Sequence, residues 1–371
     1  MEIHQLRWTS DQGWNTPPPS AQKANLILAF SDAPYFRTPD CYHDLRNLFP
    51  EAHIVGCSSS GSICDTTISD ADIIVTAITF KKGSVKLVSV GVTPGEDLEA
   101  LASGVMKQFN ADHLRHAFVL SDGLAVNGSD LARGLNSIGV SVTGGLAGDG
   151  AHFLSTWVMA DAPAAQNVIA IIGFFGDIKA KYGCVAGWHE FGAERLVTRS
   201  RGNVVFEIDY KPALSVYTKY LGELAKDLPS SGLRFPLSCR PTELDEPVIR
   251  TLLAVDVDAQ SLTFAGDVPQ GGFCRLMKTD VDSLIDGSGM AAQSAKPDVE
   301  GNSSLCLIVS CVGRRLVMGQ LTEEELDIVR EHLGPSPTIT GFYSYGELAP
   351  FSNVVGCRLH NQTMTLTTLS E

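Results

Sequence analysis

The sequence predicts an α/β protein in which layered helices cover mixed α+β sheets, arranged as two duplicated domains. The first observation is an order of segments that recurs along the chain: strand, helix, strand, glycine-rich loop and hairpin. The second is length, because 371 residues exceed the size at which one hydrophobic core keeps growing. Strands alternating with helices and hairpins predict layered packing.

Three copies of the unit are clear. In the first, residues 25–92, the strand LILAF, a helix and the strand HIVGC lead into the loop GCSSSG, and two more strands flank Lys82-Gly83-Ser84, a hairpin signal. The second copy spans 117–187 and the third spans 305–369. Residues 203–266 fit a fourth copy that lacks the glycine loop.

The copies predict a domain at 23–200 and a second domain at 201–371. Residues 1–22 precede both domains and are expected to form an extended arm. Pro17-Pro18-Pro19 supports this expectation, because a proline run lacks backbone donors and favours polyproline II.

Charge and cysteine usage exclude several classes of function. The 28 basic and 42 acidic side chains give a net charge of −14, which argues against nucleic acid as a partner. No signal peptide and no apolar run long enough to span a bilayer are present, so we expect a cytoplasmic protein without a membrane partner. Nine cysteines without zinc-type spacing indicate free thiols in a reducing compartment and no metal site.

The glycine loops 56–61, 144–150 and 341–347 are the first candidate site. Each follows a strand, and open α/β sheets bind ligands at the carboxyl ends of strands. The alternative is that the glycines are tight turns required by the repeat. Including polar residues at the strand ends, the candidate ligand-binding residues are Gly56, Cys57, Ser58, Gly61, Asp122, Gly145, Gly148, Asp149, Cys311, Arg314, Tyr343, Tyr345 and Glu347.

Arginine and cysteine suggest two chemistries at the strand ends. Arg314 and Arg315 are suited to bidentate binding of a ligand carboxylate. The alternative is that both arginines are solvated and bind no ligand. Cys57 or Cys311 is the candidate nucleophile of a cysteine-dependent enzyme. No histidine with an orienting carboxylate is placed by sequence beside either thiol, so we expect a ligand-binding protein and assign no catalytic residue.

Two histidines are candidates for an axial haem ligand. His189 follows a strand and lies among aromatic residues, and His360 precedes the last strand. A proximal histidine in an apolar pocket is a common way to hold haem iron. The alternative for each is a structural or exposed histidine.

Several motifs together resemble the FIST family of intracellular signal-transduction proteins. In the amino-terminal half the resemblance rests on VGCSSSGSI, SDGL and GGLAGDG. In the carboxy-terminal half it rests on FPL, GDVPQG, SCVGRR, GFYSYGELAP and LHNQTMTL. Residues 23–200 are thus identified as similar to a FIST N-terminal domain and residues 201–371 to a FIST C-terminal domain.

The resemblance implies a sensory module that binds a small ligand, with amino acids as one proposed class. One branch of the family binds haem, senses nitric oxide and acts on a histidine kinase, which makes haem the candidate cofactor and a kinase a candidate partner. The length leaves no space for an F-box or kinase domain, so we expect regulation of a partner protein in trans. The alternative to a sensor or a cysteine enzyme is a ligand-free interaction scaffold.

Overall fold

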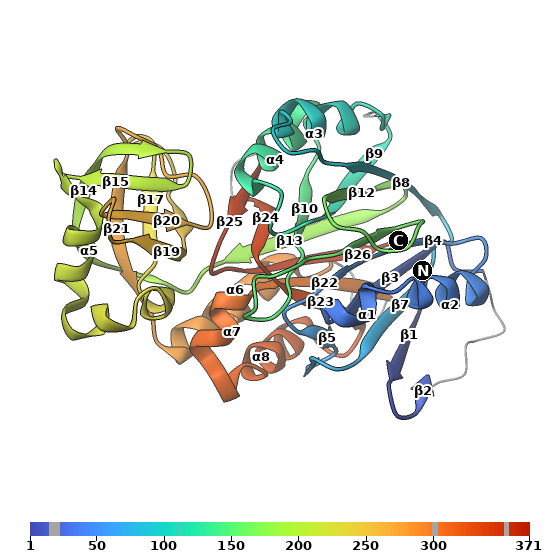
Figure 1. Ribbon diagram of the computed structural model, residues 1–371. Coiled ribbons are helices and arrows are strands. Elements are labelled where there is room, and N and C mark those ends of the chain that lie inside the picture. Colours follow the sequence, from blue (N-terminus) through green and yellow to red (C-terminus); the bar gives the residue numbers. More distant parts are fainter. Residues whose placement is uncertain (15–22, 111, 299–302, 352–355) are drawn as a thin grey trace.

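The computed structural model describes residues 1–14, 23–110, 112–298, 303–351 and 356–371. A larger body and a smaller lobe are visible in Figure 1, with the lobe on the left. The body contains the elements from the amino terminus to β13 and from α6 to the carboxyl terminus. The lobe contains the elements from β14 to β21. It is therefore an insertion in the body, which the chain leaves after β13 and re-enters at α6.

Each of the three predicted copies forms the same strand pairing, which confirms them. The first strand of a copy is central, parallel to the strand after the helix and antiparallel to a later strand. The copies consist of β3 (Leu26–Ser31), α2 (Asp40–Leu48), β4 (His53–Ser58) and β7 (Ile73–Thr79); β9 (Leu114–Ser121), α4 (Gly128–Leu135), β10 (Val142–Leu146) and β12 (Val168–Gly176); and β22 (Ser304–Cys311), α8 (Glu324–Leu333), β23 (Pro337–Ser344) and β26 (Met364–Ser370).

The strand pairing after each copy differs from the predicted hairpin. The chain turns and then crosses to a neighbouring sheet, so the two strands that flank Gly83 do not pair with each other. After the first two copies the crossing strands are β8 (Gly83–Gly91), which pairs with β12, and β13 (Lys179–Val185), which pairs with β26. The equivalent place beside β7 is taken by the amino-terminal strand β1 (Glu2–Thr9). In the third copy the hairpin predicted around Asn361-Gln362 does not form either, because β25 (Cys357–His360) pairs with β24 (Gly346–Pro350) and not with β26. A tight turn fits a hairpin and a corner between sheets equally well, and only the packing of three sheets distinguishes them.

Short strands after the glycine loops also cross between copies. They are β5 (Ser62–Cys64) on β23, β11 (Val158–Ala160) on β4 and β24 (Gly346–Pro350) on β10, with β2 (Gly13–Trp14), β6 (Thr67–Ser69) and β25 (Cys357–His360) at sheet edges. The body therefore has three six-stranded sheets, in the orders β11-β4-β3-β7-β1-β2, β25-β24-β10-β9-β12-β8 and β13-β26-β22-β23-β5-β6. Each sheet includes strands from more than one copy.

The core of the body lies between the three sheets. Apolar residues from all of them form one cluster, in which the rings of Phe30 and Phe342 stack with centroids 5.0 Å apart. Helices cover the outer face of each sheet, as Figure 1 shows. The remaining helices of the body are α1 (Ala33–Phe36), α3 (Leu98–Met106), α6 (Val281–Ala295) and α7 (Val312–Met318). Strands covered on both faces explain why LILAF and LCLIVSC are almost continuously apolar.

The lobe is antiparallel and is not a fourth copy. The predicted helix is present as α5 (Ala213–Leu221), and the predicted hairpin as β19 (Leu252–Asp256) with β20 (Ser261–Phe264). The two strands expected to be parallel, β15 (Val204–Ile208) and β17 (Leu237–Arg240), are not neighbours. The other strands are β14 (His189–Arg201), β16 (Lys211–Pro212), β18 (Val248–Arg250) and β21 (Phe273–Lys278). The predicted division at residues 200 and 201 thus falls at the end of β14, inside the lobe.

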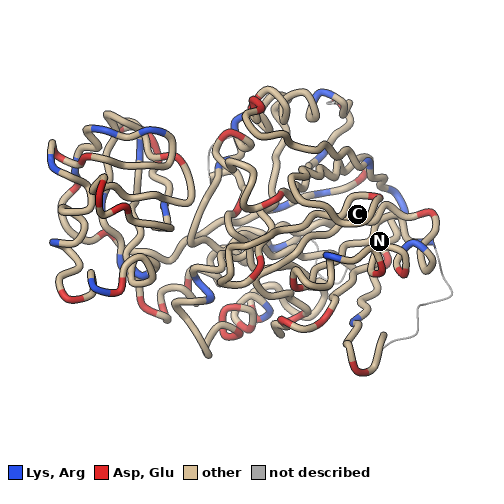
Figure 2. The backbone as a smooth tube through the Cα atoms, in the orientation of Figure 1, with Lys and Arg blue, Asp and Glu red and all other residues tan. Residues whose placement is uncertain are grey.

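The expected arm contains ordered structure. Residues 2–9 are extended, but as β1 they pair with β7 and complete the first sheet. Pro17-Pro18-Pro19 lies outside the described residues. Within the described ranges, no helix is long and apolar enough to cross a membrane. Figure 2 shows acidic and basic positions interspersed along both lobe and body.

Candidate functional site

The three glycine loops meet and close a ring of backbone hydrogen bonds. Strand register makes Ser58, Leu146 and Tyr343 equivalent, because each stands opposite a serine at the last or next-to-last position of its copy's first strand. The carbonyl of each accepts an amide from another copy, and together the three bonds connect all three loops. They run from Ser60 N to Tyr343 O (2.8 Å), from Gly148 N to Ser58 O (3.0 Å) and from Tyr345 N to Leu146 O (3.1 Å).

The glycine that begins each loop permits close approach of two strands. A Cβ atom at Gly56, Gly144 or Gly341 would lie 2.1, 2.0 or 1.9 Å from a carbonyl oxygen of the strand beside it. Such separations are far below van der Waals contact, so no larger residue fits without a backbone shift. These glycines serve the repeat, as the alternative interpretation of the loops predicts.

The other candidate glycines also face protein atoms. A Cβ atom would lie 2.6 Å from Nη1 of Arg315 at Gly61, 2.5 Å from a methyl group of Val309 at Gly145 and 2.2 Å from the Ser60 hydroxyl at Gly148. The side chains of Cys57 and Ser58, in the first glycine loop, are also buried. Whether any of them contacts a ligand stays a prediction; the structure places them in packing contacts.

Two carboxylates from the candidate set hold loops in place. Asp122 accepts the amides of Leu124 and Ala125 at 2.8 and 2.9 Å, and its second oxygen accepts the amide of Asn167. Asp149 accepts the three successive amides of 153–155, each at 2.8 Å. Burial alone would raise the pKa of Asp149, but the Tyr345 hydroxyl and these amides lower it. Carboxylates that accept several amides stabilise loop geometry.

Tyr345 is the candidate residue that lines a described cavity. Its ring stacks on Phe153 with centroids 4.6 Å apart, and its hydroxyl donates to Asp149. The cavity beside it measures about 350 Å³ and lies between the SDGL segment, residues 121–124, and the lobe. Tyr345 therefore forms part of the junction between body and lobe.

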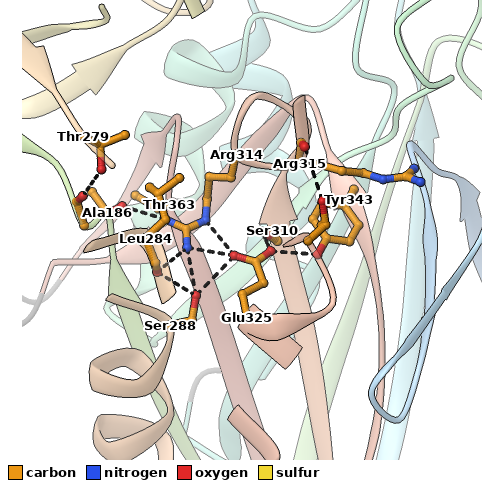
Figure 3. A network of polar contacts seen from close by, with 12 residues as sticks. Ala186, Thr279, Leu284, Ser288, Ser310, Arg314, Arg315, Glu325, Tyr343 and Thr363 are labelled. Carbon is orange, nitrogen blue, oxygen red and sulfur yellow. Dashed lines mark hydrogen bonds and ion pairs between the residues drawn. The ribbon is translucent and has the colours of Figure 1, made fainter. Parts of the chain in front are cut away.

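Arg314 binds a carboxylate that the chain itself supplies (Figure 3). Its Nη2 lies 2.8 Å from Oε2 of Glu325, and neither side chain is exposed. The Tyr343 hydroxyl donates to the other oxygen of Glu325 at 2.7 Å, and Ser310 donates to it at 3.0 Å. The guanidinium also donates to Ser288. This network joins α6, α7, α8 and two strands, so Arg314 has a structural partner.

Glu347 lies in a second buried polar cluster. It accepts the Ser344 hydroxyl at 2.6 Å and the Thr363 hydroxyl at 2.8 Å. Burial raises its pKa to about 7, although the hydrogen bonds and Arg314 act in the opposite direction. Its protonated and ionised forms are therefore close in free energy near neutral pH.

Neither candidate thiol has the environment of a nucleophile. Cys57 and Cys311 are buried, and burial raises the pKa of both. Since the thiolate is the nucleophilic form, a raised pKa opposes reaction. The cysteine-dependent enzyme gains no support from either residue.

The structure places the two candidate haem ligands in different surroundings, and haem binding stays a prediction. His189 is exposed and hydrogen-bonds with Ser283 at 3.0 Å. His360 is buried, its Nε2 donates to the carbonyl of Ala349 at 3.1 Å, and desolvation lowers its pKa to about 4. Neither lines a described cavity, and the described residues hold no group of three or more metal-ligating side chains.

A cleft of about 590 Å³ lies between the body and the lobe. The body contributes α4 and β25, and the lobe contributes β17, β18 and the segment after β20. We call it the inter-lobe cleft. It is lined by Ser129, Ala132, Arg133, Ser200, Gly202, Cys239, Pro241, Glu246, Val248, Arg250, Asp267, Val268, Pro269, Gln270, Cys357, Arg358 and Leu359.

Arg250 is a buried cation in the wall of this cleft. Its guanidinium donates to backbone carbonyls of Asp267, Ile249 and Leu359 at 2.9 to 3.1 Å. Among the described residues no carboxylate oxygen lies within 4.0 Å of it. Burial lowers its pKa. The negative charge of Asp267 acts in the opposite direction, but it does not pair directly with the guanidinium, and a buried charge without a direct counter-ion is costly.

Glu246 brings an unpartnered acceptor to the same cleft. Its Oε2 is buried and has no hydrogen-bond partner within the described part of the chain. Arg358, which also lines the cleft, donates to the backbone carbonyl of Glu246 rather than to the carboxylate. The cleft therefore holds an unpaired cation and an unsatisfied carboxylate oxygen at once.

Asp267 fastens the lobe to the body at the edge of the cleft. Its carboxylate accepts Asn127 Nδ2 at 3.2 Å and Arg133 Nη1 at 3.4 Å, and its amide donates to Ser129 Oγ at 3.2 Å. All three partners belong to α4 or its N-cap. We call these contacts the Asp267 latch.

The sequence contained weak signals for the residues that line the cleft. Asp267 lies in GDVPQG, one of the motifs that carry the resemblance. Arg250 interrupts the largely apolar run VIRTLL, and a charge in such a run indicates a partner or a ligand. Nothing in the sequence indicates that these residues face α4 and β25 across a cleft.

The FIST N domain matches residues 25–211, and the FIST C domain matches residues 213–350. The chain belongs to the FIST family. FIST domains are associated with signal transduction and ligand sensing. The junction between the two matched domains lies in the lobe, next to the turn from β15 to β16.

A curated relative of this FIST protein is the uncharacterized protein MJ1623 of Methanocaldococcus jannaschii. It is 22% identical over 317 residues, which are 79% of this chain and 61% of the relative. The FIST protein thus spans about three fifths of that relative's length.

Two solved structures align along the whole FIST chain, each at 8% identity. A chorismatase aligns with a TM-score of 0.36, and a cyanuric acid hydrolase from A. caulinodans with a TM-score of 0.38. Each alignment covers 100% of this chain and 98% of the other. Scores this low carry no argument about the activity of the FIST protein.

Proposed function

We propose that this FIST protein is a sensor that binds a small anionic ligand in the inter-lobe cleft and regulates a partner protein in trans. The observation that carries the proposal is Arg250, a buried guanidinium without a carboxylate partner among the described residues, in the wall of a cavity of about 590 Å³. Cavities of this size suit small metabolites. A ligand carboxylate would supply the missing counter-charge.

Glu246 narrows the chemistry of the proposed ligand. Its buried Oε2 accepts no hydrogen bond from a described residue. A ligand with a carboxylate and an N–H or O–H group would therefore pair with Arg250 and donate a hydrogen bond to Glu246. Amino acids and hydroxy acids have this composition. A keto acid lacks the donor and is expected to bind more weakly.

The position of the cleft provides a route from binding to signalling. A ligand shifts a conformational equilibrium only if its affinity differs between the two states. A ligand held between Arg250 on the lobe and residues of β25 on the body favours the state in which the two approach. The Asp267 latch is the contact that such a shift would strengthen or break.

Thermal unfolding with a panel of amino, hydroxy and keto acids tests the proposal. A ligand at about 100 times its dissociation constant stabilises the native state by about 2.7 kcal/mol, which corresponds to a few degrees for a protein of this size. Arg250→Gln is expected to abolish the shift. The matched control is Arg115→Gln, which removes an exposed guanidinium bonded to the Gly176 carbonyl.

Two results would contradict the proposal. One is the absence of a shift for the wild type across the panel. The other is a shift that Arg250→Gln leaves unchanged. A haemin titration followed by absorption is run in parallel, because haem remains a prediction of the family resemblance. A Soret band that is lost in His360→Ala or His189→Ala would identify haem, and not an anion, as the ligand.

A further inference from the structure

Cys239 and Cys274 stand directly opposite each other on the neighbouring strands β17 and β21. The amide of Met277 donates to the carbonyl of Pro236 at 2.9 Å, which marks those two residues as a hydrogen-bonded pair. Along an antiparallel ladder, hydrogen-bonded and non-hydrogen-bonded pairs alternate. The cysteine pair lies three positions further along the same register, so it is a non-hydrogen-bonded pair.

This kind of pair has the geometry of a disulfide. Opposed Cα atoms in a non-hydrogen-bonded pair are about 4.5 Å apart, which lies inside the range of about 4.4–6.8 Å seen for disulfides. The two side chains share one face of the sheet, and Leu237 and Leu276, two residues away on each strand, are buried in the same core. Both sulfurs are free thiols in this structure.

One of the two cysteines lines the inter-lobe cleft, although its side chain is buried. Cys239 and Arg250 both line the cleft, and Cys274, opposite Cys239 on β21, is not among the lining residues. Cys357 lines the same cleft, but its register partner is Pro350. The opposed pair is therefore a distinct feature of the lobe and not a general property of cysteines near the cleft.

We propose that Cys239 and Cys274 form a redox-convertible dithiol that closes to a disulfide in the wall of the inter-lobe cleft. Oxidation uses a low-molecular-weight disulfide. The deprotonated Cys239 sulfur attacks it, forming a mixed disulfide and releasing one small thiol. The Cys274 sulfur then attacks Cys239, forms the internal S–S bond and releases the second small thiol. Two electrons and two protons pass from the cysteines to the oxidant, and a dithiol reductant reverses the exchange.

The environment sets the rate of this exchange. Burial raises the pKa of Cys239 to about 12, while Arg250 acts in the opposite direction. Burial also raises the pKa of Cys274. Because only the thiolate attacks, oxidation is slow at neutral pH and accelerates as pH rises.

The disulfide would act on the wall that carries Arg250. Cys239 stands opposite Val248 of β18, and Arg250 is two residues further along that strand. Because β18 pairs with β17, a covalent bond between β17 and β21 restrains the neighbour of the strand that carries Arg250. The inference goes beyond ligand sensing and does not depend on it.

Thiol mapping of the full chain tests the proposal. Protein purified in reductant is exchanged into oxidised glutathione at pH 7.5 and at pH 9, and free thiols are alkylated after denaturation. Mass spectrometry of the digest is expected to show loss of two of the nine alkylatable cysteines and a peptide linking Cys239 to Cys274, both reversed by dithiothreitol. Cys239→Ser and Cys274→Ser each abolish the link, and Cys357→Ser, the matched control, retains it.

Two outcomes would overturn the proposal. In one, all nine cysteines remain alkylatable at both pH values after a day in oxidant. In the other, the internal disulfide links different cysteines. A mixed disulfide that persists on Cys239 without closing counts against it as well, because the opposed thiol is then not positioned for attack.

Discussion

Arg314 and Glu325 form an ion pair with no exposed surface on either side chain. The same guanidinium donates hydrogen bonds to both segments of the chain that connect the body to the lobe. Nη1 donates to the carbonyl of Ala186, just before the chain enters the lobe, at 2.6 Å. Nη2 donates to the carbonyl of Leu284, just after the chain returns, at 2.8 Å. The pair therefore anchors the base of the lobe.

Removing one member of this pair is expected to destabilise the protein strongly. Glu325→Gln leaves a buried guanidinium without a counter-ion, which typically costs about 3–5 kcal/mol. The measurement is urea unfolding. The control is Asp65→Asn, which removes the partner of Arg330 in an exposed pair and is expected to cost less than about 1 kcal/mol. Equal losses in the two variants would show that burial of the pair is unimportant.

A methyl group at the first glycine of a loop is expected to disrupt the ring of backbone hydrogen bonds that joins the three glycine loops. In Gly341→Ala the new Cβ lies 1.9 Å from the carbonyl oxygen of Ile308, so a strand must shift, at a cost of about 1–3 kcal/mol. Gly91→Ala is the control, because no atom lies within 4 Å of its Cβ position. Chemical unfolding of the two variants compares them, and equal stability would contradict the packing argument.

Glu347 is expected to make stability fall as pH rises. Its pKa is raised from 4.5 to about 7 in the native state, so the native state holds a proton that the unfolded state has lost. The resulting stability is complete below pH 4.5 and disappears as pH passes through 7, an effect of about 3 kcal/mol. Unfolding curves between pH 4.5 and 8 measure it.

Glu347→Gln provides the comparison, since its side chain cannot ionise. The difference in unfolding free energy between wild type and variant is expected to shift in favour of the variant as pH rises across this interval. A constant difference would show that Glu347 titrates normally in the native state.

Loss of the Asp267 latch is expected to loosen the lobe. Asp267→Ala removes the carboxylate that accepts Asn127 and Arg133 across the junction. Hydrogen exchange is expected to increase in α4 and in β20 with little change in the core of the body. Asp258→Ala, at an exposed turn of the lobe, is the control. Unchanged exchange at α4 would show that the latch does not hold the two parts together.

Local sequence patterns were sufficient for the elements of each copy. The apolar run LILAF gives β3, and a helix follows in each copy, as α4 does in the second, where Asn127 is the N-cap. The same reasoning placed the turn at Gly83 but assigned its strands to a hairpin. A turn signal is local, whereas the choice between pairing with β7 and pairing with β12 depends on a sheet formed more than 70 residues later.

The candidate site shows the same division. Sequence reasoning selected the glycine loops, and the structure brings the three loops together in one ring of hydrogen bonds. It paired Arg314 with a ligand carboxylate, whereas the nearest carboxylate belongs to Glu325 on the next helix. It missed Arg250, because an arginine in an apolar strand has no visible counter-ion or cavity in one dimension.

By itself the sequence determined the mixed α/β class, the three copies and membership of the FIST family, because these depend on periodicity and motifs that are read along the chain. Only the tertiary structure decided that the copies exchange strands, that the fourth segment is an inserted antiparallel lobe and that Arg250 faces a cleft. Those features depend on contacts between residues far apart in sequence, and the free energy of burial and ion pairing is set by such contacts.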